Sequence, residues 1–290
     1  MKPARFAYHA PETLAETLGL LADADRDVRV LAGGQSLVPM MNFRLAVPEA
    51  LVDIGRVAEL RFLRVEDGGE LRVGAGTRQA ELLRDGRVTA GWPLLAEGVR
   101  HVGHPQIRSR GTVCGSLAHN DPTAELPALA LALGARLTLA GHAGRRELDA
   151  DAFFLSYYEV ALKPSEMLVS AAFPAPRPGS GWSFQELARR RGDFALIGAV
   201  CVLRAGDDGR IGSARLVIFG AGGRPLRVDA AEQALLGTVG DRGTAAEVAR
   251  LVAGAVRPLS DIHASAEYRR ALAGELAARC VLEAWERCAR

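Results

Sequence analysis

The sequence predicts an α+β fold in two parts, and three observations lead to this prediction. Strand-like and helix-like segments alternate through residues 1–176. Residues 174–181 (PAPRPGSG) then form a stretch dense in proline, glycine and serine, which is typical of a linker. Beyond it, a hairpin pattern is followed by helices. We therefore expect one domain over residues 1–176, with lobes at about 1–56 and 57–176, and a second over residues 177–290.

The first lobe is predicted from one helix and two strands. Leu14, Leu18 and Leu21 recur at helical spacing, so residues 11–24 are expected to form a surface helix. Residues 28–31 (VRVL) and 51–54 (LVDI) are short and apolar, and each indicates a strand.

The second lobe begins with a hairpin. Residues 61–65 and 70–73 flank Asp67-Gly68-Gly69, and such a turn favours a tight reversal between two strands. Helices are expected to start within residues 79–83 and 127–133, and further strands at residues 136–139 and 167–173.

The C-terminal part repeats the hairpin pattern before it becomes helical. Residues 199–204 and 214–219 flank the turn GDDG at 206–209. Helices are expected over residues 230–236, 245–256 and from about 265 onward. In the last of these, an approximate apolar stripe is made by Leu272, Leu276, Cys280 and Trp285.

Composition excludes several classes of protein. Apolar residues make up 49% and charged residues 24% of the 290 residues, as in ordinary globular proteins. The net charge of +2 comes without a basic run, so nucleic acid is not an indicated partner. No stretch has the length and apolarity of a membrane span or of a signal peptide, so we expect a cytoplasmic protein. The four cysteines are scattered without a C-x-x-C pair, which argues against a cysteine-ligated metal cluster and against a disulfide framework.

Two glycine-bearing segments carry most of the functional information. They are residues 32–36 (AGGQS), which follow the predicted strand at 28–31, and residues 112–116 (TVCGS). Each pattern predicts a tight turn in which small residues let backbone N–H groups approach an anion closely. Two such turns suit a pyrophosphate, whose charge must be met by several converging donors. The chain has neither G-x-G-x-x-G nor G-x-x-x-x-G-K-[ST], so the commoner nucleotide-binding loops are missing.

The longer sequences around these segments resemble one family. Residues 32–45 (AGGQSLVPMMNFRL) and 110–127 (RGTVCGSLAHNDPTAELP) are similar to the two FAD-pyrophosphate segments of the FAD-binding medium subunits of molybdenum hydroxylases, such as carbon monoxide and xanthine dehydrogenases. The resemblance extends along the whole chain. Further matching stretches are residues 53–54, 92–95, 104–108, 163–164 and 190–195.

The resemblance implies a fold, a cofactor and a set of binding residues. The first domain would be a two-lobed FAD-binding domain of the vanillyl-alcohol-oxidase/PCMH-like type. The second would be an α+β domain of the carbon monoxide dehydrogenase flavoprotein type, with a three-stranded sheet and helices. FAD would bind to the two glycine segments, to acceptors after the second one, and to residues beside the flavin ring. These candidates are Ala32, Gly33, Gly34, Gln35, Ser36, Leu37, Thr112, Cys114, Gly115, Ser116, His119, Asp121, Glu125, Leu168, Asp193 and Phe194.

Some of these residues have ordinary structural interpretations as well. Many family members carry glycine where this chain has Cys114, and a cysteine there favours an ordinary negative φ and a small packed side chain over a redox role. Phe194 is expected either beside the flavin ring, where carbon monoxide dehydrogenases have a tyrosine, or in the core at the start of a strand. Leu168 matches a leucine that packs over the flavin in xanthine dehydrogenases, and its residue type alone would indicate core.

Metal and hydrolase sites are not indicated. His101 and His104 form an H-x-x-H pair without two further ligands at supporting spacing, and Pro105 argues against one helix carrying both. His119 beside Asp121 suits a hydrogen bond to a cofactor or within its own loop. No G-x-S-x-G elbow is present for a serine hydrolase.

The resemblance therefore implies an FAD-dependent oxidoreductase subunit. It would collect electrons from a small subunit with [2Fe-2S] clusters, next to a large molybdopterin subunit, and pass them to NAD+, O2 or a quinone. A dimer of heterotrimers is the expected assembly. Two alternatives stay open from the sequence: a stand-alone flavoenzyme that oxidises a small molecule directly, and a non-catalytic assembly protein that holds FAD or another nucleotide.

Overall fold

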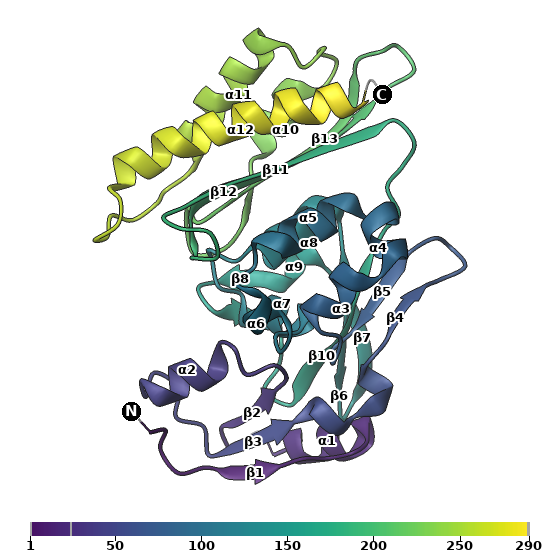
Figure 1. The fold of residues 1–290 in the computed structure, drawn as a ribbon, viewed down its shortest axis with the longest axis vertical. Coiled ribbons are helices and arrows are strands. Elements are labelled where there is room, and N and C mark those ends of the chain that lie inside the picture. Colours follow the sequence, from purple (N-terminus) through teal and green to yellow (C-terminus); the bar gives the residue numbers. More distant parts are fainter. Residues whose placement is uncertain (1, 24, 289–290) are drawn as a thin grey trace.

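The computed structural model describes residues 2–23 and 25–288, and in them three larger sheets succeed one another along the molecule (Figure 1). The first is a small parallel sheet at the N-terminal end, in the order β1-β3-β2. Thr13 caps the helix α1 that joins β1 to β2, because its side chain accepts a hydrogen bond from Glu16 N at 3.2 Å. The elements are β1 (Ala7–His9), α1 (Leu14–Leu21), β2 (Val28–Leu31), α2 (Leu37–Asn42) and β3 (Ala50–Asp53).

The second sheet is antiparallel and has the order β4-β5-β10-β6-β7. Two 3-10 turns, Ile54–Arg56 and Ala58–Leu60, lead into it from β3. Its strands are β4 (Leu63–Val65), β5 (Leu71–Gly74), β6 (Arg136–Gly141), β7 (Gly144–Asp149) and β10 (Glu166–Phe173).

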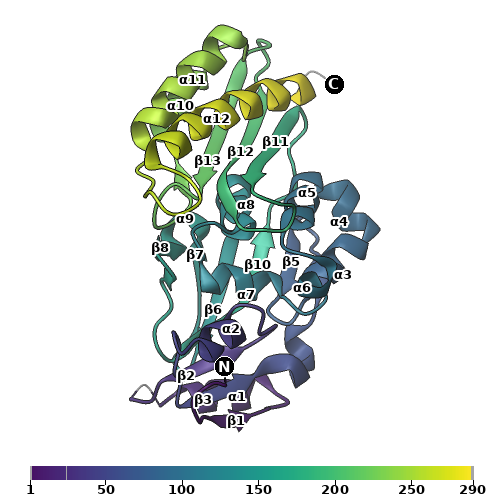
Figure 2. The ribbon, with the colours of Figure 1, turned by 60° about the vertical axis from the view of Figure 1, so that its left-hand side comes forward.

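Helices cover one side of this second sheet and separate it from the C-terminal part (Figure 2). Between α9 and β10 the chain forms a separate hairpin, β8–β9. The elements are α3 (Gln79–Arg84), α4 (Gly86–Gly91), α5 (Pro93–His101), α6 (Pro105–Arg108), α7 (Val113–His119), α8 (Glu125–Leu133), α9 (Ala150–Phe153), β8 (Phe154–Ser156) and β9 (Glu159–Val160).

The third sheet is an antiparallel meander, β11-β12-β13-β14, with α11 and α12 on its outer face (Figure 2). The linker before it is anchored by Trp92, whose indole Nε1 donates to Pro174 O at 2.9 Å. Its elements are β11 (Ser180–Ala188), β12 (Ala195–Ala205), β13 (Ile211–Phe219), β14 (Leu226–Arg227), α10 (Asp229–Leu235), α11 (Arg242–Ala255) and α12 (Ala266–Cys288).

The period-2 alternation of β12 divides the buried residues into two cores. Val200 faces the large core that fills the N-terminal and middle parts of the molecule. Its neighbours Ala199 and Cys201 point to the opposite face and pack in a second core with Val248 and Val281 of the outer helices. A single strand thus contributes to both cores, and this ties the third sheet to the rest of the molecule.

Most expected elements are present, with three corrections. The N-terminal lobe contains β1 and α2, which were not expected. The second glycine segment is a helix, α7, and not a tight turn. The C-terminal sheet has four strands rather than three, because the two-residue strand β14 pairs with β13. Of the helix expected over residues 11–24, α1 covers Leu14–Leu21, and residue 24 lies outside the described residues. Among the described residues, no helix combines the length and apolarity needed to cross a membrane.

Candidate functional site

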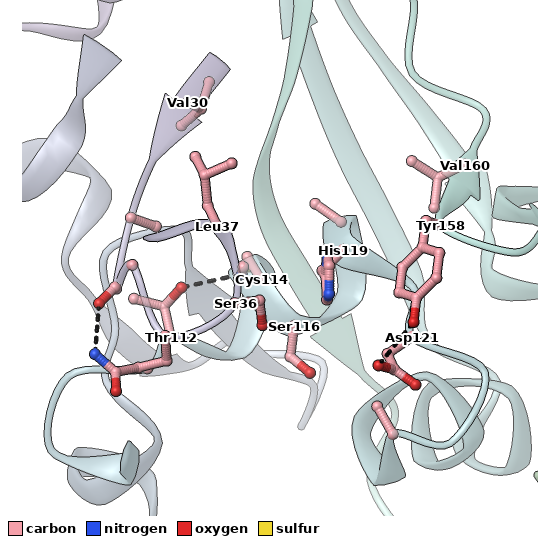
Figure 3. Close-up of a pocket in the computed structure, with 18 of the residues that line it drawn as sticks. Val30, Ser36, Leu37, Thr112, Cys114, Ser116, His119, Asp121, Tyr158 and Val160 are labelled. Atoms are coloured by element: carbon pink, nitrogen blue, oxygen red, sulfur yellow. Dashed lines mark hydrogen bonds between the residues drawn. The ribbon is translucent and has the colours of Figure 1, made fainter. Parts of the chain in front are cut away.

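A cavity of about 1230 Å³ lies between the N-terminal sheet, the middle helices and the connection between β11 and β12. Figure 3 shows the part of it between β2, α7 and the β8–β9 hairpin. It is larger than the roughly 300–1,000 Å³ of a pocket for a drug-sized molecule, as a dinucleotide requires. Every binding residue expected from the sequence lines this one cavity. They are Ala32, Gly33, Gly34, Gln35, Ser36, Leu37, Thr112, Cys114, Gly115, Ser116, His119, Asp121, Glu125, Leu168, Asp193 and Phe194.

The first glycine segment, residues 32–37, forms one wall as it leaves β2. Gly34 has φ +71°, a conformation that costs an L side chain about 1–2 kcal/mol. A Cβ on Gly33 would lie 2.4 Å from the carbonyl oxygen of Arg110, two residues before the second segment, so the two stretches of backbone touch at this point. Within the described chain, the N–H groups of residues 33–37 have no protein acceptor. This wall therefore offers unpaired backbone donors to an anion.

The second glycine segment, residues 112–116, consists of the N-cap and the first turn of α7. Thr112 is its N-cap, and Gly115 N donates to the Thr112 hydroxyl at 3.0 Å. That hydroxyl and that N–H group are thus already paired with each other, whereas Ser116 faces the cavity from the first turn (Figure 3). Cys114 lies in the helix with ordinary φ and is buried, as the sequence suggested. Burial raises the pKa of its thiol to about 12, so it stays protonated and unreactive.

Polar groups gather at the far end of α7. Asp121 is buried, and its Oδ1 accepts from Thr123 N at 2.9 Å and from the Thr123 hydroxyl at 2.6 Å. Tyr158 donates its hydroxyl to Asp121 Oδ2 at 3.4 Å, and its ring lies 5.1 Å from that of His119 (Figure 3). Burial lowers the pKa of His119, so the imidazole is neutral near pH 7 and can accept as well as donate.

Glu125 lines the cavity, as expected, and its burial changes its protonation state. It was expected to act as an acceptor, but it is almost fully buried, and burial together with nearby Glu186 raises its pKa to about 8. Near pH 7 the carboxyl is therefore mainly protonated and can donate a hydrogen bond to a ligand as well as accept one.

The connection between β11 and β12, together with β10 of the second sheet, contributes the other candidate residues. Phe194 precedes β12, lines the cavity and is 70% exposed, so it is not the core residue that its sequence context also allowed. Asp193 lies beside it, 3.4 Å from Arg189 in an ion pair. Leu168 of β10 is buried and lines the cavity from the opposite side.

Sequence reasoning missed several residues that the fold brings to the cavity. Tyr158 has φ +55° in the β8–β9 turn, which no local pattern indicated. Gln79 is buried with an Oε1 that has no partner in the described chain, and it lines the cavity beside the second segment. A buried acceptor left unpaired here is an observation that fits a polar ligand.

The histidines that suggested a metal pattern have other neighbours. His101 Nδ1 lies 3.8 Å from Glu186 Oε2, and its Nε2 lies 3.6 Å from Glu97 Oε1. His104 packs against Gly192, where an added Cβ would lie 2.5 Å from the ring. The residues that the structure describes contain no group of three or more His, Cys, Asp or Glu positioned to hold a metal ion.

These features fit FAD: a dinucleotide-sized cavity, unpaired N–H groups on a glycine wall, an unpaired buried amide oxygen and apolar surfaces for a ring. The comparisons agree. Residues 4–176 match the family described as the FAD binding domain in molybdopterin dehydrogenase, and residues 182–284 match the CO dehydrogenase flavoprotein C-terminal domain. The chain belongs to this family of FAD-binding oxidoreductase subunits.

Individual relatives match over nearly their whole length. The carbon monoxide dehydrogenase medium chain of Hydrogenophaga pseudoflava is 37% identical, covering 100% of both chains. The nicotine 6-hydroxylase medium subunit of Paenarthrobacter nicotinovorans is 38% identical, covering 99% of this chain and 100% of the relative. A solved structure of quinoline 2-oxidoreductase from Pseudomonas putida 86 superposes with a TM-score of 0.92 at 39% identity, covering 99% of both chains.

Proposed function

We propose that this chain is the electron-transfer flavoprotein subunit of a molybdenum hydroxylase, with FAD in the cavity described above. It would receive electrons from the [2Fe-2S] clusters of a small subunit and pass them to NAD+, O2 or a quinone. The observation that carries the proposal is the meeting of two glycine segments, about eighty residues apart in sequence, at one dinucleotide-sized cavity. Bound FAD supplies the redox chemistry, and this chain supplies binding, orientation and electrostatics.

Different walls of the cavity would bind different parts of FAD. The free N–H groups of residues 33–37 and the Ser36 and Ser116 hydroxyls would hold the pyrophosphate. Asp121, paired with Tyr158, and the protonated Glu125 would hold polar groups elsewhere on the cofactor. Asp121, Glu125 and Tyr158 lie between α7 and α8, on α8 and in the β8–β9 turn, so the middle part of the chain would hold these polar groups of the cofactor.

The flavin ring would lie at the apolar end of the cavity. Leu168 and Phe194 would pack against it, with Asp193 beside them. We retain the division proposed from the sequence, with FAD bound mainly by residues 1–176, in lobes at about 1–56 and 57–176. Residues 177–290 would cover the end of the cavity that holds the flavin ring.

The partner surface is proposed at the mouth of this cavity. Two large apolar side chains are exposed on elements that also carry lining residues. Phe43, 66% exposed, caps the C-terminal end of α2, whose first residue Leu37 lines the cavity, and Ile262, 94% exposed, lies between the lining residues Asp261 and His263. Exposed apolar patches next to a functional cavity are typical of interaction sites. Electrons must reach the cofactor over a short distance, so we assign this surface to the iron–sulfur subunit. The complete complex would be a dimer of heterotrimers that also contains a molybdopterin subunit.

The cytoplasm is the proposed location. All four cysteines are free thiols, three of them buried, which suits a reducing compartment.

Purification from the native host tests the assignment. The chain should co-elute with iron, molybdenum and FAD at a mass well above 30.8 kDa, and heating should release FAD rather than FMN. Phe43→Asp and Ile262→Asp should dissociate the complex while each chain keeps its FAD. Val65→Asp, at an exposed apolar position on β4 that does not line the cavity, should leave the complex intact. A metal-free monomer that oxidises a small molecule at FAD would contradict the proposal and favour a stand-alone flavoenzyme.

A further inference from the structure

The two glycine segments are held in place by different means. The second is fixed by backbone hydrogen bonds to the turn before α3: Gln79 N donates to Gly111 O at 2.9 Å, and Val113 N donates to Thr77 O at 3.2 Å. Among the described residues, no backbone hydrogen bond joins residues 32–37 to residues 110–116. The contact between Gly33 and the Arg110 carbonyl therefore has no backbone hydrogen bond to maintain it.

One side chain does join them. Arg78 lies between Thr77 and Gln79, the two residues whose backbones hold the second segment. Its guanidinium Nη1 donates to Ala32 O of the first segment at 3.4 Å and also to Arg110 O, just before the second segment. Arg78 is itself held at the N-cap of α3, where its backbone N–H donates to Glu81 Oε2 at 2.9 Å.

The partial burial and the charge of Arg78 strengthen these hydrogen bonds. Arg78 is half-buried, and burial followed by the nearby Arg110 and Arg61 lowers its pKa, although a guanidinium stays protonated in proteins. Hydrogen bonds from a charged donor contribute about 1.5–3 kcal/mol, more than neutral ones. Without Arg78, the Ala32 and Arg110 carbonyl oxygens would lose the donor that they share, and the two segments would be free to separate.

We propose that Arg78 is a positioning residue that sets the separation of the two glycine segments and thereby the affinity for FAD. Arg78 is not among the residues that line the cavity, so it acts through the backbone of the segments and not by contact with the cofactor. This inference rests on the proposed FAD site. It adds a residue that controls FAD affinity from outside the cavity, at the N-cap of α3.

The test uses the full-length apo chain and FAD titration followed by flavin fluorescence. Arg78→Ala should raise the dissociation constant for FAD about tenfold or more, since a tenfold change corresponds to about 1.4 kcal/mol, close to one charge-assisted hydrogen bond. Arg78→Lys retains a charged donor and should recover part of this loss. Arg84→Ala is the matched control, because Arg84 is an exposed arginine on the same helix, and it should bind FAD like the wild type.

Hydrogen exchange of the apo chain separates positioning from general stability. In Arg78→Ala, the hydrogen-bonded amides at the two segments should exchange faster, while those of β12 in the third sheet should be unchanged. The amides to follow are Val38, which donates to Gly34 O, and Val113 and Ser116, which donate to Thr77 O and Thr112 O. The inference is overturned if Arg78→Ala binds FAD like the wild type, if its affinity falls with no change in exchange at the two segments, or if exchange rises equally in β12. A wild-type chain that does not bind FAD would instead overturn the proposed site, and the affinity claim with it.

Discussion

The first glycine segment is a partly exposed turn that leads into the six-residue helix α2, whereas the second is the capped start of α7, packed on the central sheet. In the first, residues 33–37 are partly or fully exposed, and their N–H groups have no protein acceptor in the described chain. In the second, Val113, Cys114 and Leu117 are buried. One segment thus offers unpaired donors, and the other offers a rigid support.

The two segments therefore use glycine for different reasons. Gly34 is required by its positive φ, and Gly33 by its approach to Arg110 O. Gly115 has helical geometry, and its missing side chain leaves room for the Thr112 hydroxyl that caps the helix, since a Cβ would lie 2.5 Å from that oxygen. The two segments are similar in sequence, but substitution of their glycines should have different effects.

The largest expected effect comes from the first segment. Gly34→Val places a β-branched residue at φ +71°, with its Cβ 3.2 Å from Val38 Cγ2, and should displace the N–H groups that face the cavity. FAD affinity should fall by at least about a hundredfold, the loss of two hydrogen bonds to a charged group at about 1.5–3 kcal/mol each. FAD titration and thermal denaturation of the apo chain measure affinity and stability separately.

Gly115→Ala provides the comparison. It should act first on the helix cap, lowering stability by about 1 kcal/mol and FAD affinity by less than Gly34→Val does. The assignment of different roles to the two segments would be wrong in either of two cases: if Gly34→Val bound FAD with wild-type affinity, or if Gly115→Ala lost as much FAD affinity as Gly34→Val.

The same contrast explains how much of the fold the sequence could predict. The strand over residues 28–31 was predicted with its observed limits, because Val28, Val30 and Leu31 make a short apolar run just before an obvious glycine break. The helix α7 was read as a turn, since a glycine and a β-branched residue disfavour helix locally. The Thr112 cap is a local signal that the sequence contains, but burial of Val113 and Leu117, which stabilises the helix, depends on the tertiary structure.

The shortest strands and the contacts between residues far apart in sequence could not be predicted from the sequence. The strand β1 has three residues and β14 has two, too few to show a period, and both form because a neighbouring strand is available. At the site, the family motifs led to the lining residues. Arg78 and Tyr158 were missed because their roles depend on partners 32 and 37 residues away.

A smaller, pH-dependent effect is expected at the buried acids that follow the second segment. Burial raises the pKa of Glu186 to about 7, and that of Glu125 to about 8. His101 faces Glu186 at 3.8 Å, and Glu97, Asp121 and Arg108 are the other charged groups around the pair. The folded chain thus binds more protons than the unfolded chain between about pH 4.5 and 8, so stability should fall as pH rises through this range.

Glu186→Gln should flatten this dependence. Each group loses at most about 1.4 kcal/mol per pH unit within its window, so the difference between the wild type and Glu186→Gln should be on the order of 1 kcal/mol or more between pH 6 and 7. The midpoint of urea unfolding, measured on the apo chain across this range, tests it. Glu97→Gln, at a more exposed carboxyl beside the same histidine, should keep the wild-type slope. Parallel slopes for Glu186→Gln and the wild type would show that the acid is not protonated in the folded state.

The smallest effect is expected at Cys114, where the second segment departs from the glycine common in the family. Its thiol donates to Val73 O at 3.6 Å inside the core, and burial keeps it protonated, so it should resist iodoacetamide at pH 8. Burial also raises the pKa of Cys288, but that thiol is only partly buried and should react faster than Cys114. Cys114→Ala removes a small buried group and should lower stability by about 1 kcal/mol, with FAD affinity changed less than about threefold. Mass spectrometry of the alkylated native chain and FAD titration measure these two outcomes. Alkylation of Cys114 as fast as that of Cys288 would mean that the start of α7 opens in solution, and the second segment could then not be the rigid support that distinguishes it from the first.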